Sequence, residues 1–188
     1  MGFGGRAPGV IATAGLAAAL TALVASPALA KDKMYSYDAV SPNARALTGV
    51  GLTFEFRPTL MGATRVDRFM LTGRSGAAEV KPASEGALGK GGLAALIGPD
   101  AKERALYQIT LKRDGDAFIR AACPNSTKAW LVLGPIRYGE DLRVHAIGDD
   151  PVTGKSRLCG TFEFSFRGEW KLPELPVRAE DDEPRTPL

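Results

Sequence analysis

The chain has 188 residues, of which 45% are hydrophobic and 24% are charged, with a formal net charge of +3. This length suits one domain that can bury most of its apolar surface without a metal. The basic residues form no block, which argues against a nucleic-acid partner, because such a partner favours a concentrated basic face.

The first thirty residues have the order of a cleavable secretory signal peptide. Arg6 precedes an apolar run at 10–25, which is followed by a helix-breaking Pro and by the Ala-Leu-Ala sequence at 28–30. This order predicts cleavage between Ala30 and Lys31 and export to the periplasm or the medium. An uncleaved anchor is the alternative, because the run is close to the shortest length that spans a bilayer. A mature mass that lacks the signal peptide is the measurement that checks export.

Removal of residues 1–30 leaves 158 residues. We divide them into a single globular β-rich domain at 31–176 and a C-terminal tail at 177–188. The tail has no apolar period and mixes Pro with Glu and Asp, which predicts disorder. The mature part has no apolar run of membrane-spanning length, so we expect a soluble domain without a membrane span.

A helix and a half-buried strand are predicted early in the domain. Ser41 and Pro42 suit the N-cap and the first helical position, and Gly49 suits the end of a two-turn helix at 42–48. Next, Leu52, Phe54 and Phe56 alternate with polar residues, as in a strand with one buried face.

A second helix is predicted at 91–97, where Leu93, Leu96 and Ile97 recur at helical spacing before Gly98. Asp114 and Gly115 then predict a hairpin between strands at 106–111 and 117–122, because Asp-Gly tolerates a tight turn. The full set of predicted strands is 34–37, 52–57, 64–72, 78–81, 106–111, 117–122, 130–133, 142–147 and 158–166.

Short strands joined by turns predict a β-rich α+β fold. We expect an antiparallel sheet that is curled into a sandwich or an open barrel, with two short helices at one edge. Thr-Phe-Glu-Phe occurs both at 53–56 and at 161–164. A duplication could explain this echo, and so could two strands with the same alternation.

Two cysteines, Cys123 and Cys159, lie in the mature part. In an oxidising compartment, such a pair forms a disulfide, which would stabilise the fold by roughly 4 kcal/mol. Their wide separation argues against a redox pair, because redox-active cysteines are usually separated by two residues.

The segment 148–156, Gly-Asp-Asp-Pro-Val-Thr-Gly-Lys-Ser, ends like a phosphate-binding loop. However, Asp149 stands where the loop needs its first glycine, and the residues that follow predict a strand where the loop needs a helix. We interpret the segment as a polar turn between two antiparallel strands.

His145 is the only histidine in the chain. It alternates with Arg143 and Ile147, opposite Leu142 and Val144, which predicts the solvent side of a sheet. His145 is also the only available imidazole base, and Glu55 and Glu163 could form a carboxylate pair if their strands were neighbours. These three residues are weak catalytic candidates, and the sequence predicts no cofactor and no metal site.

Three hypotheses about function remain. The favoured one is an exported, non-catalytic protein of the cell envelope that binds an unidentified envelope protein or ligand, because no catalytic set is assembled in the sequence. The second is an extracytoplasmic hydrolase that uses His145 or the pair Glu55 and Glu163. The third is a structural or assembly factor of the envelope.

Overall fold

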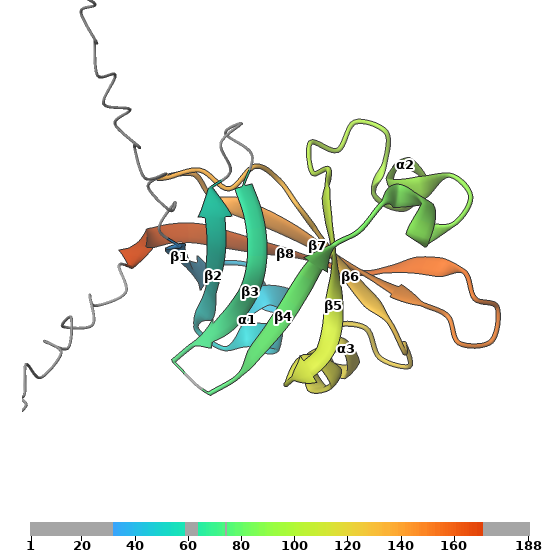
Figure 1. Ribbon diagram of the computed structural model, residues 1–188, viewed down its shortest axis with the longest axis horizontal. Coiled ribbons are helices and arrows are strands. Elements are labelled where there is room, and N and C mark those ends of the chain that lie inside the picture. Colours follow the sequence, from blue (N-terminus) through green and yellow to red (C-terminus); the bar gives the residue numbers. More distant parts are fainter. Residues whose placement is uncertain (1–31, 59–63, 74, 171–188) are drawn as a thin grey trace, which may run out of the picture.

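The computed structural model describes residues 32–58, 64–73 and 75–170. The predicted signal peptide, its cleavage site at Ala30 and Lys31, and the tail at 177–188 lie outside these residues. Within them, eight antiparallel strands form a closed barrel in which each strand pairs with its sequence neighbours and β1 pairs with β8 (Figure 1). The β-rich antiparallel fold is confirmed, and the barrel is closed instead of open.

Eight of the nine predicted strands and both predicted helices are confirmed in position. The strands are β1 Lys33–Ala39, β2 Gly51–Pro58, β3 Thr64–Thr72, β4 Ala77–Pro82, β5 Ala105–Arg113, β6 Ala129–Leu133, β7 Leu142–Asp149 and β8 Ser156–Trp170. The helices are α1 Pro42–Thr48, the 3₁₀ turn η1 Glu85–Leu88, α2 Gly92–Ile97 and α3 Gly115–Ala122. None of the described helices is both long enough and apolar enough to cross a membrane.

Inward-facing side chains of alternate residues fill the barrel with aromatic and aliphatic groups. The largest of those that are almost fully buried are Tyr37, Phe54, Phe69 and Phe164. Because side chains on a strand alternate between faces, the period of two in β2 and β8 places their phenylalanines inside and Glu55 and Glu163 outside. The two copies of Thr-Phe-Glu-Phe lie in β2 and β8, and both of these strands pair with β1.

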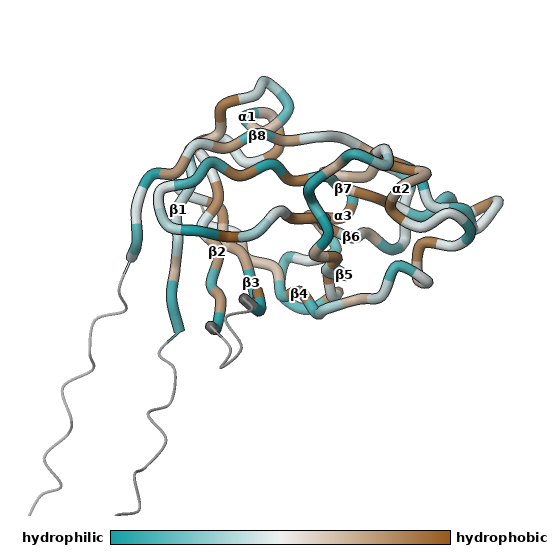
Figure 2. Tube along the Cα trace, turned by 90° about the horizontal axis from the view of Figure 1, so that it is seen from above, coloured by the Kyte–Doolittle hydropathy of each residue, from teal (hydrophilic) through white to brown (hydrophobic). Residues whose placement is uncertain are grey.

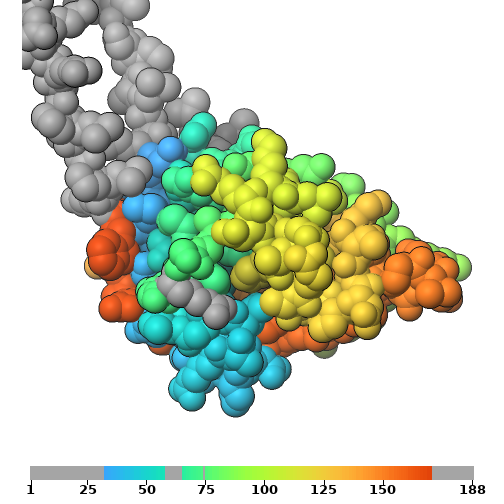
Figure 3. Space-filling model, turned by 90° about the horizontal axis from the view of Figure 1, so that it is seen from below, coloured from blue at the N-terminus to red at the C-terminus, as the bar shows by residue number. Residues whose placement is uncertain are grey.

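One end of the barrel is covered by α1 and α3, which lie next to each other in Figure 3. Ser41 caps α1, since its Oγ accepts the Ala44 N–H at 3.2 Å. Leu47 of α1 and Phe118 of α3 join the barrel core. At this end, the predicted disulfide is confirmed: it joins Cys123, at the end of α3, to Cys159 in β8.

The strand predicted at 117–122 is wrong, because this segment is the helix α3. Its buried residues Phe118, Ile119 and Ala122 have the i, i+1, i+4 spacing of one helical face. The Asp-Gly pair begins the helix instead of a hairpin. Gly115 fits there because a Cβ would lie 1.8 Å from the Thr110 carbonyl oxygen.

A second, smaller apolar cluster lies outside the barrel. The segment 83–104, which contains η1 and α2, covers the outer faces of β5, β6 and β7, and Figure 2 shows α2 beside β7. The buried residues of this outer cluster are Leu88, Leu93, Leu106, Trp130, Val132 and Ile147. As a result, β6 is buried on both faces.

Candidate functional site

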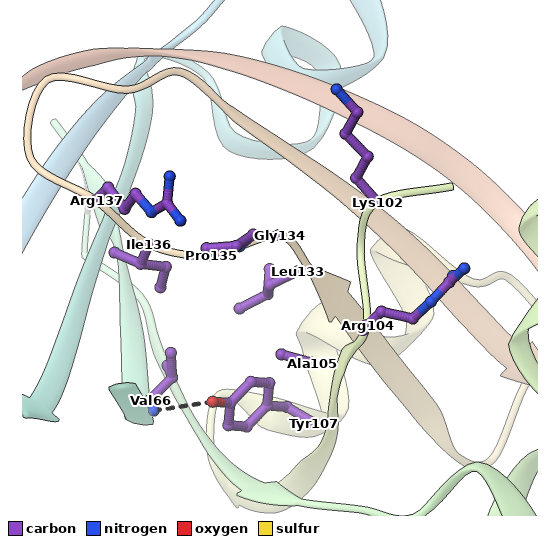
Figure 4. A pocket seen from close by; sticks show the side chains of 10 residues that line it. All are labelled: Val66, Lys102, Arg104, Ala105, Tyr107, Leu133, Gly134, Pro135, Ile136 and Arg137. Carbon is purple, nitrogen blue, oxygen red and sulfur yellow. Dashed lines mark hydrogen bonds between the residues drawn. The ribbon is translucent and has the colours of Figure 1, made fainter. Parts of the chain in front are cut away.

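A cavity of about 480 Å³ lies at the end of the barrel opposite α1 and α3 (Figure 4). We call it the mouth cavity. It is lined by Val66, Lys102, Arg104, Ala105, Tyr107, Leu133, Gly134, Pro135, Ile136 and Arg137. Its volume falls within the range of small-molecule sites in proteins.

The inner wall of the mouth cavity is apolar. Val66, Tyr107 and Leu133 come from β3, β5 and β6, and they belong to the barrel core. Ala105 and Ile136 are partly buried and pack against the same core. The cavity is therefore an extension of the barrel interior, where an apolar group can be removed from water.

The cavity owes part of its shape to the separation of β3 from β4 at this end. Their pairing extends only from Met70 to Arg68, whereas β4 continues along β5 as far as Pro82. The free Val66 N–H donates instead to the Tyr107 hydroxyl at 3.3 Å, as Figure 4 shows. The ring of Tyr107 therefore spans the gap between β3 and β5.

Three cationic side chains, Lys102, Arg104 and Arg137, line the outer part of the cavity, and its described lining contains no carboxylate. All three residues are exposed. The guanidinium of Arg104 donates to the carbonyl oxygens of Pro99, at 3.0 Å, and Glu103, at 3.2 Å, which braces the segment before β5. An apolar interior below cationic groups suits a ligand with an apolar body and an anionic head.

The prediction that His145 faces solvent is wrong, since the residue is only 7% exposed. His145 does point away from the barrel interior, as its alternation with the inward-facing Val144 indicates. It is buried because the segment 83–104 covers the outer face of β7. A single strand pattern cannot show that a distant segment packs on its polar face.

His145 lies between Thr161 and Glu103. Its Nδ1 is 2.9 Å from Thr161 Oγ1, and its Nε2 is 3.5 Å from Glu103 Oε2 without a hydrogen bond of ordinary geometry. Glu103 is also buried, at 8% exposure. Neither His145 nor Thr161 lines the mouth cavity, whereas Glu103 lines a separate cavity together with Arg143 and Glu163.

The structure does not bring Glu55 and Glu163 together. Both flank β1, but Glu55 is opposite Met34, whereas the Glu163 carbonyl accepts the Val40 N–H. Six residues of strand separate these positions, which is about 20 Å. Glycosidase carboxylates lie within about 10 Å of each other.

Each of these carboxylates also has its own cationic partner. Glu55 forms an ion pair with Arg68, and Glu163 forms one with Arg143 at 3.1 Å. Both residues therefore support the outer surface of the sheet. The described residues contain no group of three or more His, Cys, Asp or Glu that could hold a metal.

The segment 148–156 is the polar turn that the sequence predicts, between β7 and β8. Burial alone would raise the pKa of Asp149, but hydrogen bonds from the Thr127 hydroxyl and the N–H groups of Thr127 and Lys128 outweigh it and lower the pKa. Backbone N–H groups of Thr153 and Val152 lower the pKa of Asp150. Two ionised carboxylates would repel a phosphate here.

Sequence reasoning did not identify the cationic lining of the mouth cavity. Lys102 and Arg104 precede β5, and Arg137 lies in the connection between β6 and β7. In the sequence, each is one of 24 dispersed basic residues and belongs to no motif. Only the closure of the barrel brings them to one opening.

Comparisons with models of known families, with curated proteins and with solved structures found no match to this chain.

Proposed function

We propose that this protein is an exported, non-catalytic binding protein of the cell envelope, and that the mouth cavity holds a small ligand with an anionic head and an apolar body. The observation that carries this proposal is the pairing of an apolar inner wall with three cationic side chains in one cavity of about 480 Å³. Export is inferred from the signal-peptide pattern, and the disulfide is consistent with an oxidising compartment.

The chemistry of the cavity favours this class of ligand over others. Val66, Leu133 and Ile136 offer no hydrogen-bonding side chains, so the inner wall gains from burying hydrocarbon. The ammonium and guanidinium groups can form charge-assisted hydrogen bonds with a carboxylate, sulfonate or phosphate. A cationic ligand would meet the like charges of Lys102 and Arg104, and that of Arg137, which is paired with Glu140 at 3.4 Å.

Dodecanesulfonate tests the proposal, because it combines a C12 chain with a head group that stays charged over the working pH range. Titration below its micelle concentration, followed by calorimetry, should show saturable binding at one site. Dodecyltrimethylammonium has the same chain and the opposite charge, and we expect it to bind at least tenfold more weakly.

The double variant Lys102→Gln/Arg137→Gln should weaken dodecanesulfonate binding by about tenfold or more, because it removes two of the charge-assisted contacts. Lys155→Gln is the matched control, since Lys155 is an exposed cation in the turn at the other end of the barrel. Absence of binding, or equal binding of both surfactants, would overturn the proposal.

A further inference from the structure

We propose that the ligand of the mouth cavity also carries an ammonium group, which binds the Glu103 carboxylate in an adjoining cavity. The ligand is then a zwitterionic amphiphile whose groups follow the order apolar chain, anion, ammonium, as in an alkyl ester of phosphoethanolamine. This inference deepens the proposed function and rests on it, because the mouth cavity must hold the chain and the anion.

The adjoining cavity, which we call the side cavity, has a volume of about 450 Å³. It shares Lys102, Gly134 and Pro135 with the mouth cavity, so the two cavities meet at these residues. Figure 4 shows Lys102 and Gly134 on the side of the mouth cavity away from Tyr107. The other residues that line the side cavity are Val40, Glu103, Glu140, Asp141, Leu142, Arg143, Glu163 and Phe164. A ligand in the mouth cavity can therefore extend past Lys102 into the side cavity.

The two cavities differ in the charge of their linings. The described lining of the mouth cavity has three cationic residues and no carboxylate, whereas that of the side cavity has four carboxylates and two cations, Lys102 and Arg143. A ligand that extends from the apolar inner wall through both cavities meets cations first and carboxylates second. This order of charges selects an anion next to the apolar chain and a cation beyond it.

Three of the four carboxylates in the side cavity already have partners. These pairs are Glu163 with Arg143 at 3.1 Å, Glu140 with Arg137 at 3.4 Å, and Asp141 with the Phe166 N–H at 2.9 Å. The fourth carboxylate, that of Glu103, accepts no hydrogen bond from the described residues. It is therefore the group in this cavity that a ligand can satisfy.

Glu103 is also the buried member of the set, at 8% exposure. The Nε2 of His145 lies 3.5 Å from its Oε2 but forms no hydrogen bond with it. Its chain neighbour Lys102 is exposed, and the described structure shows no ion pair between the two. Since a buried carboxylate without a hydrogen bond is costly, a ligand that brings an N–H donor and a positive charge gains binding energy here.

A primary ammonium suits this carboxylate better than a metal ion does. The ammonium combines a positive charge with three N–H donors, so a single carboxylate can bind it through a charge-assisted hydrogen bond. In contrast, Ca²⁺ requires several oxygen ligands at once. The described residues contain no group of three or more His, Cys, Asp or Glu that could hold a metal. The chemistry of the side cavity thus favours an organic ammonium.

Two phosphate diesters with the same dodecyl chain test the inference. Dodecyl 2-aminoethyl phosphate carries the ammonium, and dodecyl ethyl phosphate has an ethyl group in its place, while the phosphate has one negative charge in both. Calorimetric titration at pH 7, below the micelle concentration of each ester, measures their affinities. We expect the aminoethyl ester to bind the wild-type protein at least tenfold more tightly, because only its ammonium can pair with Glu103.

Glu103→Gln should reduce this preference to less than about twofold, because the amide has no charge to attract the ammonium. The variant should bind dodecyl ethyl phosphate as the wild-type protein does, which would show that its mouth cavity is intact. Glu169→Gln is the matched control, since Glu169 is an exposed carboxylate in β8 that lines neither cavity. We expect the control to retain the full preference.

Equal binding of the two esters by the wild-type protein would overturn the inference, and so would a Glu103→Gln variant that keeps the preference. In both cases, binding of dodecyl ethyl phosphate leaves the proposed function standing. A Glu103→Gln variant that binds neither ester would also overturn the inference, because Glu103 would then support the mouth cavity itself. If the wild-type protein binds neither ester, the proposed function fails and the inference fails with it.

Discussion

Two tyrosines of the barrel core differ in the environment of their hydroxyl groups. Tyr37 is fully buried, and its hydroxyl has no hydrogen-bond partner among the described residues. Tyr107 is also buried, but its hydroxyl accepts the Val66 N–H at the mouth cavity. Burial raises the pKa of both phenols, because removal from water disfavours the phenolate.

Replacement of each tyrosine by phenylalanine should therefore have opposite effects. Tyr37→Phe should raise the free energy of unfolding by about 1 kcal/mol, because it removes an unsatisfied buried group. Tyr107→Phe should lower it by about 1 kcal/mol, because the Val66 N–H loses its acceptor. Urea denaturation at pH 7 measures both values, and the same sign for both variants would contradict the account.

At the scale of elements, α3 connects β5 to β6, and its first residue lies close to the backbone of β5. The helix begins at Gly115, directly after β5, and packs Phe118 into the end of the barrel. This arrangement leaves no room for a side chain at the first helical residue, since the Thr110 carbonyl oxygen occupies its place. A glycine at this position allows β5 to continue into the helix that covers the barrel.

Gly115→Ala should lower the free energy of unfolding by about 2 kcal/mol, because the new methyl group forces the backbone of β5 and α3 apart. Gly168→Ala in β8 is the matched control, since a Cβ there would have no heavy atom within 4 Å. We expect the control to change stability by less than about 0.5 kcal/mol. Thermal and urea denaturation of both variants would measure this contrast, and equal losses would argue against the steric explanation.

At the scale of the whole molecule, the disulfide connects the barrel cover to the closing strand. Cys123 ends α3, and Cys159 lies in β8, which pairs with both β1 and β7. The sequence separation of 36 residues makes this a long covalent loop. In the unfolded chain, such a link restricts many conformations, which favours the folded barrel.

Reduction of this disulfide should lower the free energy of unfolding by roughly 4 kcal/mol. Urea denaturation with and without dithiothreitol measures the difference. The double variant Cys123→Ser/Cys159→Ser should resemble the reduced protein and should not respond to dithiothreitol. A response in the variant would show that the reagent acts elsewhere.

The sequence predicted the positions of the eight strands and the inward phenylalanines of β2 and β8, because alternation along a strand is a local signal. It also predicted α1 from its capping residues and the disulfide from the pair of cysteines. The α3 segment was mispredicted because its Asp-Gly start is also a hairpin signal and its burial depends on the barrel end.

Barrel closure, the burial of His145 and the mouth cavity depended on the tertiary structure. Each arises from segments that are distant in the sequence: β1 meets β8, the segment 83–104 covers β7, and Lys102, Arg104 and Arg137 converge at one opening. A local pattern records which face of a strand is apolar. It does not record what packs against the other face, because that depends on the free energy of the whole chain.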